Sequence, residues 1–158
     1  MDEEYATSGT VRESPEDFHV TEILENSPTG NGPNTYIRLQ VRELDTLEVV
    51  QILAEYLDRE TEDFCVADYK GSQSVALQWI SLEHLDPRAL DNFQHDNIEI
   101  IKITRHPEKL QPVDLEGNRF EITLREISEE APEAVRAGLK ILRERGVPNW
   151  YSKRAFGF

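Results

Sequence analysis

Two short apolar segments joined by a polar turn constrain the fold of this chain more than any other stretch. The segments are Phe64–Ala67 and Val75–Ile80, and the turn between them contains Gly71. Apolar runs of this length on either side of a Gly- and Ser-containing turn are typical of two neighbouring buried strands. Glycine tolerates a positive φ, so we expect Gly71 to adopt one and the turn to present Lys70 at the mouth of a sheet.

Alternating apolar and polar residues predict four more strands around this pair. A turn at Pro15 leads into the first of them, and a loop rich in Gly, Pro and Asn at 25–34 separates it from the second. The last strand is expected to follow a turn at Gly117–Asn118. The four predicted strands cover residues 18–24, 35–41, 98–103 and 120–124.

Two amphipathic helices are predicted, and a short third one at Pro87–Phe93. Asp45 and Glu48 form a capping box before the helix at residues 46–57. The apolar residues expected on its buried face are Leu47, Val50, Leu53, Ala54 and Leu57.

The other long helix is predicted over residues 128–145, with Pro132 in its first turn and Gly146 as its stop. Strands and helices in this order predict an α+β fold. It would have a mixed, mainly antiparallel sheet and two main helices.

Chain length and composition set the expected domain organisation and location. A chain of 158 residues is expected to form one domain over residues 11–158, preceded by a mobile N-terminus at residues 1–10. With neither a long apolar run nor a signal peptide, we expect a cytoplasmic protein without a membrane partner. The single cysteine, Cys65, excludes an internal disulfide and is expected in the core. The four histidines lack metal-ligand spacing, so no metal site is expected.

Charge is the most extreme compositional feature of the sequence. Asp and Glu number 31 against 17 Lys and Arg, which gives a formal net charge of −14. Proteins that bind nucleic acids without sequence preference carry basic faces that neutralise phosphates, so this composition opposes RNA binding and predicts no DNA binding. Two alternatives remain open: a locally basic groove on an acidic body, and a surface adapted to high salt.

Three ordered stretches resemble the tRNA pseudouridine synthase D family. They are residues 12–22, which contain the PEDF tetrapeptide, residues 67–79, and residues 146–157. The resemblance covers nearly the whole chain and corresponds to the N-terminal half of the family's enzymes. It implies part of the pseudouridine synthase catalytic fold, isomerisation of uridine to pseudouridine in tRNA, and no cofactor or metal.

The resemblance also implies a set of substrate-binding residues. Arg12 stands where the family usually has a lysine, and Phe18 matches a phenylalanine that lines the uridine site. Lys70 matches the lysine of the central motif. In the third motif the matching residues are Asn149 and Tyr151. Phe18 could equally be a core residue and Tyr151 an anchor for the tail, because aromatic side chains dominate protein cores.

The central motif departs from the family at its catalytic position. The family's nucleophile is an aspartate, and Gly71 occupies that position here. Glycine offers no carboxylate for nucleophilic or general-base catalysis, so the motif is catalytically degenerate. Asp68 is the candidate substitute, because residues two apart on an extended segment share a side and Asp68 would meet Lys70. Its alternative role is that of a turn-capping acid.

These observations leave three functional hypotheses. The first is a pseudouridine synthase D-like protein that is inactive as an isolated chain. The second is a non-catalytic interaction module, in which a homo-oligomer or a complementary chain covers the aromatic C-terminal tail at residues 150–158. The third is one half of a two-chain enzyme, whose reactive acid would be Asp68 or a residue of the partner.

Overall fold

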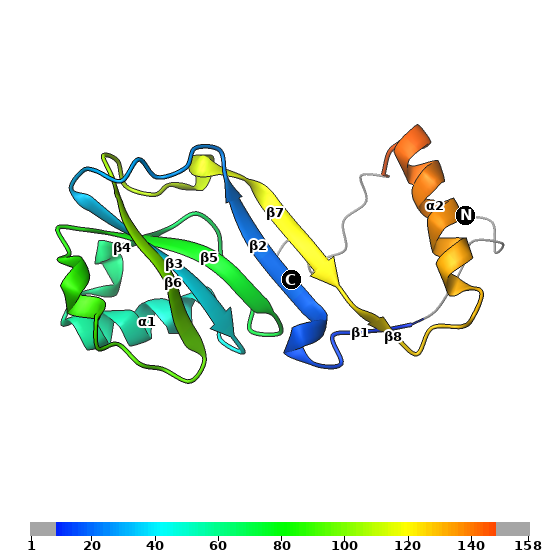
Figure 1. The fold of residues 1–158 in the computed structure, drawn as a ribbon, viewed down its shortest axis with the longest axis horizontal. Helices are drawn as coiled ribbons and strands as arrows, with labels where there is room; N and C mark the ends of the chain where they lie inside the picture. Colours follow the sequence, from blue (N-terminus) through cyan, green and yellow to red (C-terminus); the bar gives the residue numbers. More distant parts are fainter. Residues whose placement is uncertain (1–8, 148–158) are drawn as a thin grey trace. The chain divides into compact units, whose positions relative to one another are not determined.

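The structure is a computed structural model that describes residues 9–147 (Figure 1). The chain divides into two compact units, each of which is described by itself. The larger unit is Val11–Thr123, and the smaller unit combines Met1–Thr10 with Leu124–Phe158. The prediction of a single domain over residues 11–158 stays a prediction, and most of the predicted mobile N-terminus lies outside the described residues.

The larger unit is built on a six-stranded sheet in the order β6-β3-β5-β2-β7, with β4 paired to β5. The pairing of β2 with β5 is parallel and the other pairings are antiparallel. This mixed, mainly antiparallel α+β arrangement confirms the predicted fold class. The strands are β2 (Phe18–Leu24), β3 (Asn34–Arg42), β4 (Phe64–Val66), β5 (Val75–Glu83), β6 (Ile98–His106) and β7 (Leu115–Ile122).

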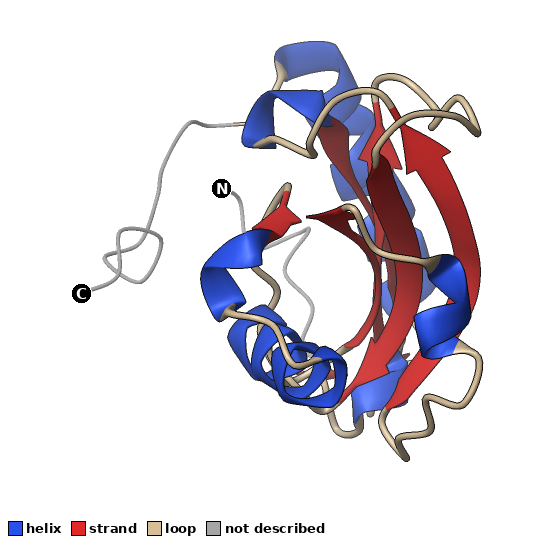
Figure 2. Ribbon diagram, turned by 90° about the vertical axis from the view of Figure 1, so that its left-hand side faces the viewer, coloured by secondary structure: helices blue, strands red, loops and turns tan. Residues whose placement is uncertain are grey.

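Helix α1 (Thr46–Leu57) packs against one face of this sheet, and the sheet curves around it (Figure 2). Apolar residues of β3 and β5 meet apolar residues of α1 in a continuous buried cluster, which includes Ile37, Leu39, Leu53 and Ile80 at 0% exposure. Burial of each such side chain contributes roughly 1.5–3 kcal/mol. This cluster therefore fixes the position of α1 on the sheet.

The start of α1 is capped as the sequence predicts. The Asp45 carboxylate accepts the Glu48 N–H at 2.9 Å, and the Glu48 carboxylate accepts the Asp45 N–H at 2.7 Å. The predicted buried face is wrong at Leu47, which is 56% exposed. Val49 is buried in its place, because the face turned to the sheet is set by Thr46, Val49, Val50, Leu53 and Ala54.

The two apolar segments that open the sequence argument are β4 and β5, and they pair as predicted, with Val66 opposite Ile80. Cys65 is only partly buried there, beside the Tyr36–Trp79 cluster. The predicted positive φ of Gly71 is wrong, since this glycine is not among the residues with positive φ. The connection at residues 67–74 is long enough to reverse direction without one.

The predicted turn at Gly117–Asn118 is also wrong, because both residues lie inside β7, opposite Ile23 and Glu22. The chain reverses earlier, at a 3₁₀ turn over Pro112–Asp114. Other 3₁₀ turns cover Pro15–Asp17, Thr61–Asp63 and Pro87–Leu90. The first confirms the predicted proline turn, and the last begins where the short helix was predicted but ends at Leu90 rather than Phe93.

Strand β1 (Thr10–Val11) pairs with β8 (Leu124–Arg125), and the smaller unit contains Thr10, β8 and helix α2 (Ala131–Arg145). Helix α2 begins later than the predicted Ser128, and Pro132 lies in its first turn. Gly146 ends it with a φ of 82°, a conformation that favours glycine. Among the described residues, no helix is both long and apolar enough to cross a membrane.

Candidate functional site

A cleft of about 460 Å³ in the larger unit gathers most of the residues that the sequence singles out. Arg12, Phe18, Asp68, Lys70 and Gly71 all line it, although they come from separate stretches of the chain. Asn149 and Tyr151 lie outside the described residues. The other lining residues are Val20, Tyr69, Ser72, Gln73, Ser74, Asn118 and Phe120.

Strands β2 and β7 form one wall of the cleft. Their antiparallel register places Val20 opposite Phe120 and Glu22 opposite Asn118. Directly opposed residues on paired strands point to the same face, so these side chains all point towards the cleft side. The connection between β4 and β5, residues 67–74, supplies the other wall.

Lys70 carries the principal charge of the cleft and is almost fully buried, at 8% exposure. Its ammonium donates to the Asp68 carboxylate at 2.8 Å and to Glu22 Oε1 at 3.0 Å. The other Glu22 oxygen accepts the backbone N–H of Trp79 at 2.7 Å. One cation therefore bridges two carboxylates, and β5 holds the buried one. Lys70 lies deeper than the predicted position at the mouth of the sheet.

The pKa values of the two carboxylates shift in opposite directions. Burial raises the pKa of Glu22 above its ordinary value, although the Lys70 charge and the Trp79 N–H oppose this rise. Burial would also raise the pKa of Asp68, but hydrogen bonds from Lys70 and Asn118 outweigh it and hold that pKa below its ordinary value. Asp68 is therefore the carboxylate of the pair that stays ionised to lower pH.

The Asp68 carboxylate is occupied by hydrogen bonds. It accepts from the Tyr69 N–H at 2.8 Å and from Asn118 Nδ2 at 3.2 Å, in addition to Lys70. The Asn118 side-chain oxygen is buried without a hydrogen-bond partner in the described part of the chain. Asp68 therefore fills both predicted roles: its carboxylate meets Lys70, and it caps the turn by accepting the Tyr69 N–H.

Two aromatic rings from β2 and β7, together with a guanidinium, also line the cleft. Arg12 Cζ lies 3.8 Å from the centroid of the Phe18 ring, and the Phe18 and Phe120 rings meet edge to face at 5.8 Å. A guanidinium on an aromatic face keeps its N–H donors free for another acceptor. Arg12 has a φ of 60°, a backbone conformation that is uncommon for residues other than glycine. Residues in such conformations cluster at functional sites.

Gly71 borders the cleft with open space around it. A Cβ added to this glycine would meet no atom within 4 Å, and its φ is not in the left-handed region. The position at the border of the cleft can therefore accept a side chain without strain.

Sequence reasoning missed three residues of this site: Glu22, Asn118 and Phe120. A signal for Glu22 was present, since it falls in phase with Phe18 and Val20 on the inward face of an alternating strand, where an unpaired acid is costly. Asn118 and Phe120 were misassigned to a turn and to the start of a strand. Trp79, at 7% exposure, is a core residue.

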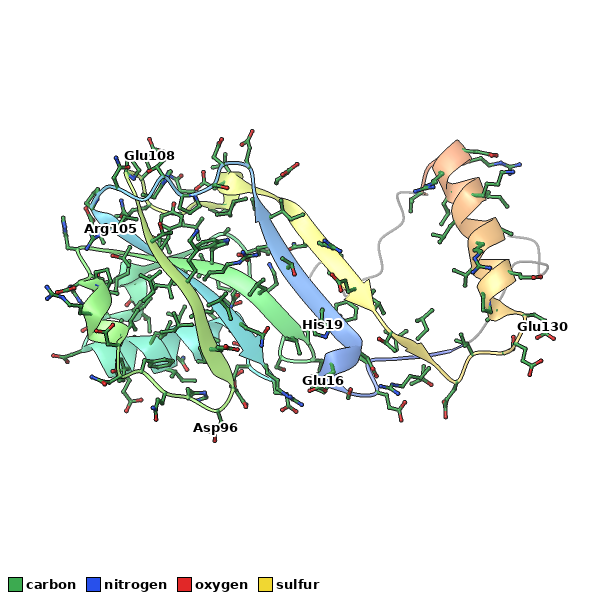
Figure 3. The ribbon with its side chains drawn as sticks, viewed as in Figure 1. Glu16, His19, Asp96, Arg105, Glu108 and Glu130 are labelled. Atoms are coloured by element: carbon green, nitrogen blue, oxygen red, sulfur yellow. The ribbon has the colours of Figure 1, made fainter. Side chains whose placement is uncertain are left out.

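Outside the cleft, exposed acidic side chains occur at separate points of the larger unit. Figure 3 labels Glu16, Asp96 and Glu108, which lie at separate points of the larger unit. Glu16 pairs with Arg42 beside the start of β2. Among residues 9–147, no group of His, Cys, Asp and Glu side chains could hold a metal ion.

The described residues thus define an α+β protein with a cleft that combines a buried charge cluster and two aromatic rings in edge-to-face contact. The family model of tRNA pseudouridine synthase D (TruD) matches residues 1–158, and the chain belongs to this family. A tRNA pseudouridine synthase D of Geotalea daltonii is 34% identical over 151 residues, which cover 96% of this chain. One from Vibrio cholerae is 36% identical over 90% of it.

A solved structure supports the same assignment. A Methanosarcina mazei protein described as a tRNA pseudouridine synthase D superposes with a TM-score of 0.82 at 32% identity and covers 94% of this chain. The chain spans 38% of the Geotalea daltonii protein and 35% of the Methanosarcina mazei chain.

Proposed function

We propose that this chain is a tRNA pseudouridine synthase D-like protein that binds uridine in RNA at the described cleft and does not isomerise it alone. The observation that carries the proposal is the convergence of Arg12, Phe18, Lys70 and Gly71 on one cleft. Phe18 and Phe120 offer ring surfaces to a base, and Arg12 offers donors to a phosphate or a carbonyl. A role on tRNA would place the chain in the cytoplasm.

The expected inactivity follows from position 71. Covalent or general-base catalysis needs a carboxylate at the reacting centre, and Gly71 supplies none. Asp68 borders the same cleft, but its carboxylate accepts hydrogen bonds from Lys70, Tyr69 and Asn118. We assign Asp68 to holding Lys70 rather than to attacking the substrate.

The affinity for RNA should depend only weakly on salt concentration. In the cleft, Lys70 is already paired with Glu22 and Asp68, which leaves Arg12 to meet a phosphate. Since each neutralised phosphate adds about one unit to the slope of log affinity against log salt, we expect a slope of about one. Stacking on the rings would supply the larger share of the affinity.

The test is a fluorescence-anisotropy titration of a labelled single-stranded RNA that contains uridine. Arg12→Ala and Phe18→Ala should each weaken binding about tenfold, the usual cost of losing a charged contact or a stacked base. Arg59→Ala changes the net charge equally on an exposed segment outside the cleft, and Tyr56→Ala removes a ring from the outside of α1. Equal losses in the cleft variants and these controls would refute the proposal.

A second candidate, the half of a two-chain enzyme or a self-associating module, is favoured by the edge of the sheet. Among the described residues, β7 pairs along one side only, with β2. Its residues Phe120 and Ile122 are 54% and 47% exposed. An unpaired edge with exposed apolar side chains is suited to an added strand. Light scattering after size exclusion would show a dimer or a larger species, whereas a monomer at all concentrations would exclude self-association.

A further inference from the structure

The backbone of the loop that carries Lys70 and Gly71 is hydrogen-bonded to another element at one residue of the described chain. Between Asp68 and Gln73, among the described residues, Lys70 alone makes backbone hydrogen bonds to another element. The remaining contacts are the side-chain bonds of Asp68 and Lys70 and a bond within the loop from Ser74 Oγ to the Gly71 carbonyl. The position of the loop backbone therefore depends on what holds Lys70.

Thr46, the first residue of α1, holds Lys70 from both sides. The Thr46 N–H donates to the Lys70 carbonyl at 3.1 Å, and the Lys70 N–H donates to the Thr46 hydroxyl at 2.8 Å. The same hydroxyl donates to Gln78 Oε1 at 3.0 Å. Thr46 and Gln78 are each 1% exposed, so water cannot replace these bonds readily.

These two bonds make the Thr46 hydroxyl a link between the loop and β5. The Thr46 hydroxyl accepts the Lys70 backbone N–H and donates to the side-chain Oε1 of Gln78. A hydroxyl can do both at once, so the bond to Gln78 helps to orient the one to Lys70. Strand β5 also holds Glu22 through the Trp79 N–H. One strand therefore anchors both the backbone of Lys70 and the carboxylate that its ammonium meets.

We propose that Thr46 is a positioning residue for the cleft, which sets where the Lys70 ammonium and residue 71 lie. Its effect on RNA binding rests on the proposed function, but its effect on Lys70 does not. Thr46→Val keeps the size of the side chain and the Thr46 N–H bond but removes the hydroxyl. The Lys70 backbone N–H and the side-chain Oε1 of Gln78 then lose their buried hydrogen-bond partner. The loop backbone loses one of its two bonds to Thr46 and becomes more mobile.

The test compares Thr46→Val with Thr35→Val, which makes the same substitution at a matched site. Thr35 is 0% exposed, and its hydroxyl donates to the Leu85 carbonyl at 2.9 Å in a region away from the cleft. Two readouts report on Lys70 itself: hydrogen exchange of its backbone amide, and the acetylation rate of its ammonium group. Thr46→Ser, which retains the hydroxyl, is the rescue variant.

Thr46→Val should speed both Lys70 readouts by about tenfold or more, the usual consequence of losing a buried hydrogen bond. Thr35→Val should leave them unchanged and Thr46→Ser should restore them. Equal effects of the two valine variants on Lys70 would overturn the proposal. If Thr46→Val fails to fold, exchange in the wild-type chain decides: a Lys70 amide that exchanges as fast as those of Gly71 and Ser72 also overturns it.

RNA affinity separates this inference from the proposed function. If the wild-type chain binds the uridine RNA, Thr46→Val should weaken binding by about tenfold and Thr35→Val should not. If no variant binds RNA while Thr46→Val still releases Lys70, the proposed function fails and the positioning role of Thr46 stands.

Discussion

Glu22 and Lys70 form a buried ion pair at the cleft, with 3.0 Å between the carboxylate and the ammonium and side-chain exposures of 0% and 6%. Strand β2 supplies the acid and the loop between β4 and β5 supplies the base. Neither charge could be buried alone without a large desolvation cost. The pair therefore links the fold of the strands to the position of the loop.

Removal of the cation from this pair should destabilise the fold strongly. Lys70→Met leaves Glu22 buried without its partner, which typically costs about 3–5 kcal/mol. The double variant Lys70→Met with Glu22→Leu removes both charges and should recover much of that loss, as expected for an apolar replacement. Urea unfolding of the wild type, the single variant and the double variant measures both effects. A single variant as stable as the double would contradict this assignment.

The two carboxylates that share Lys70 should respond to pH with opposite signs. The pKa of Asp68 is lowered in the folded chain, so its contribution to stability is present above its unfolded pKa of about 3.9 and is lost as the pH falls. The pKa of Glu22 is raised, so its contribution is complete below an unfolded pKa of about 4.3 and is lost as the pH rises through the folded value.

Free energies of unfolding across the acid range test this difference. The stability advantage of the wild type over Asp68→Asn should be present above a pH of about 3.9 and diminish as the pH falls below it. Its advantage over Glu22→Gln should be largest at acid pH and shrink as the pH rises. Parallel profiles for the two variants would show that the carboxylates do not differ in this way.

A side chain at position 71 should be tolerated by the fold. Gly71→Asp meets no atom within 4 Å at its Cβ and needs no positive φ, so we expect a stability within about 0.5 kcal/mol of the wild type. Gly32→Ala is the contrasting case, because its Cβ would collide with the His106 carbonyl at a φ of 114°. That variant should lose at least about 1 kcal/mol. Comparable thermal unfolding of the two variants would contradict the difference in local backbone geometry.

Much of the fold was predictable because its signals are local. The Asp45–Glu48 capping box and the apolar spacing after it depend on a few neighbouring residues, and the helix at Thr46–Leu57 matches the prediction at both ends. Leu47 shows what periodicity alone cannot predict. It lies near the edge of the apolar stripe, and the packing of the helix on the sheet decides which side of the stripe is buried.

The site was predictable only in part, because strand register brings its residues together. The resemblance supplied Arg12, Phe18, Lys70 and Gly71, and the structure places them on one cleft. Asn118 lines the cleft and Glu22 pairs with Lys70 behind it because β2 pairs with β7 in one particular register, with the two residues opposite each other. A pairing between residues so far apart in the chain leaves no local pattern in the sequence.

The central claim is that the cleft lacks the carboxylate needed to isomerise uridine. Its most direct test is pseudouridine formation by the wild-type chain, followed as tritium release from tRNA labelled at carbon 5 of uridine, with the chain in excess over RNA. We expect no release above that of a control without protein. Release that reaches one equivalent of tRNA, and that is lost in Asp68→Asn, would contradict the account and identify Asp68 as the reactive acid.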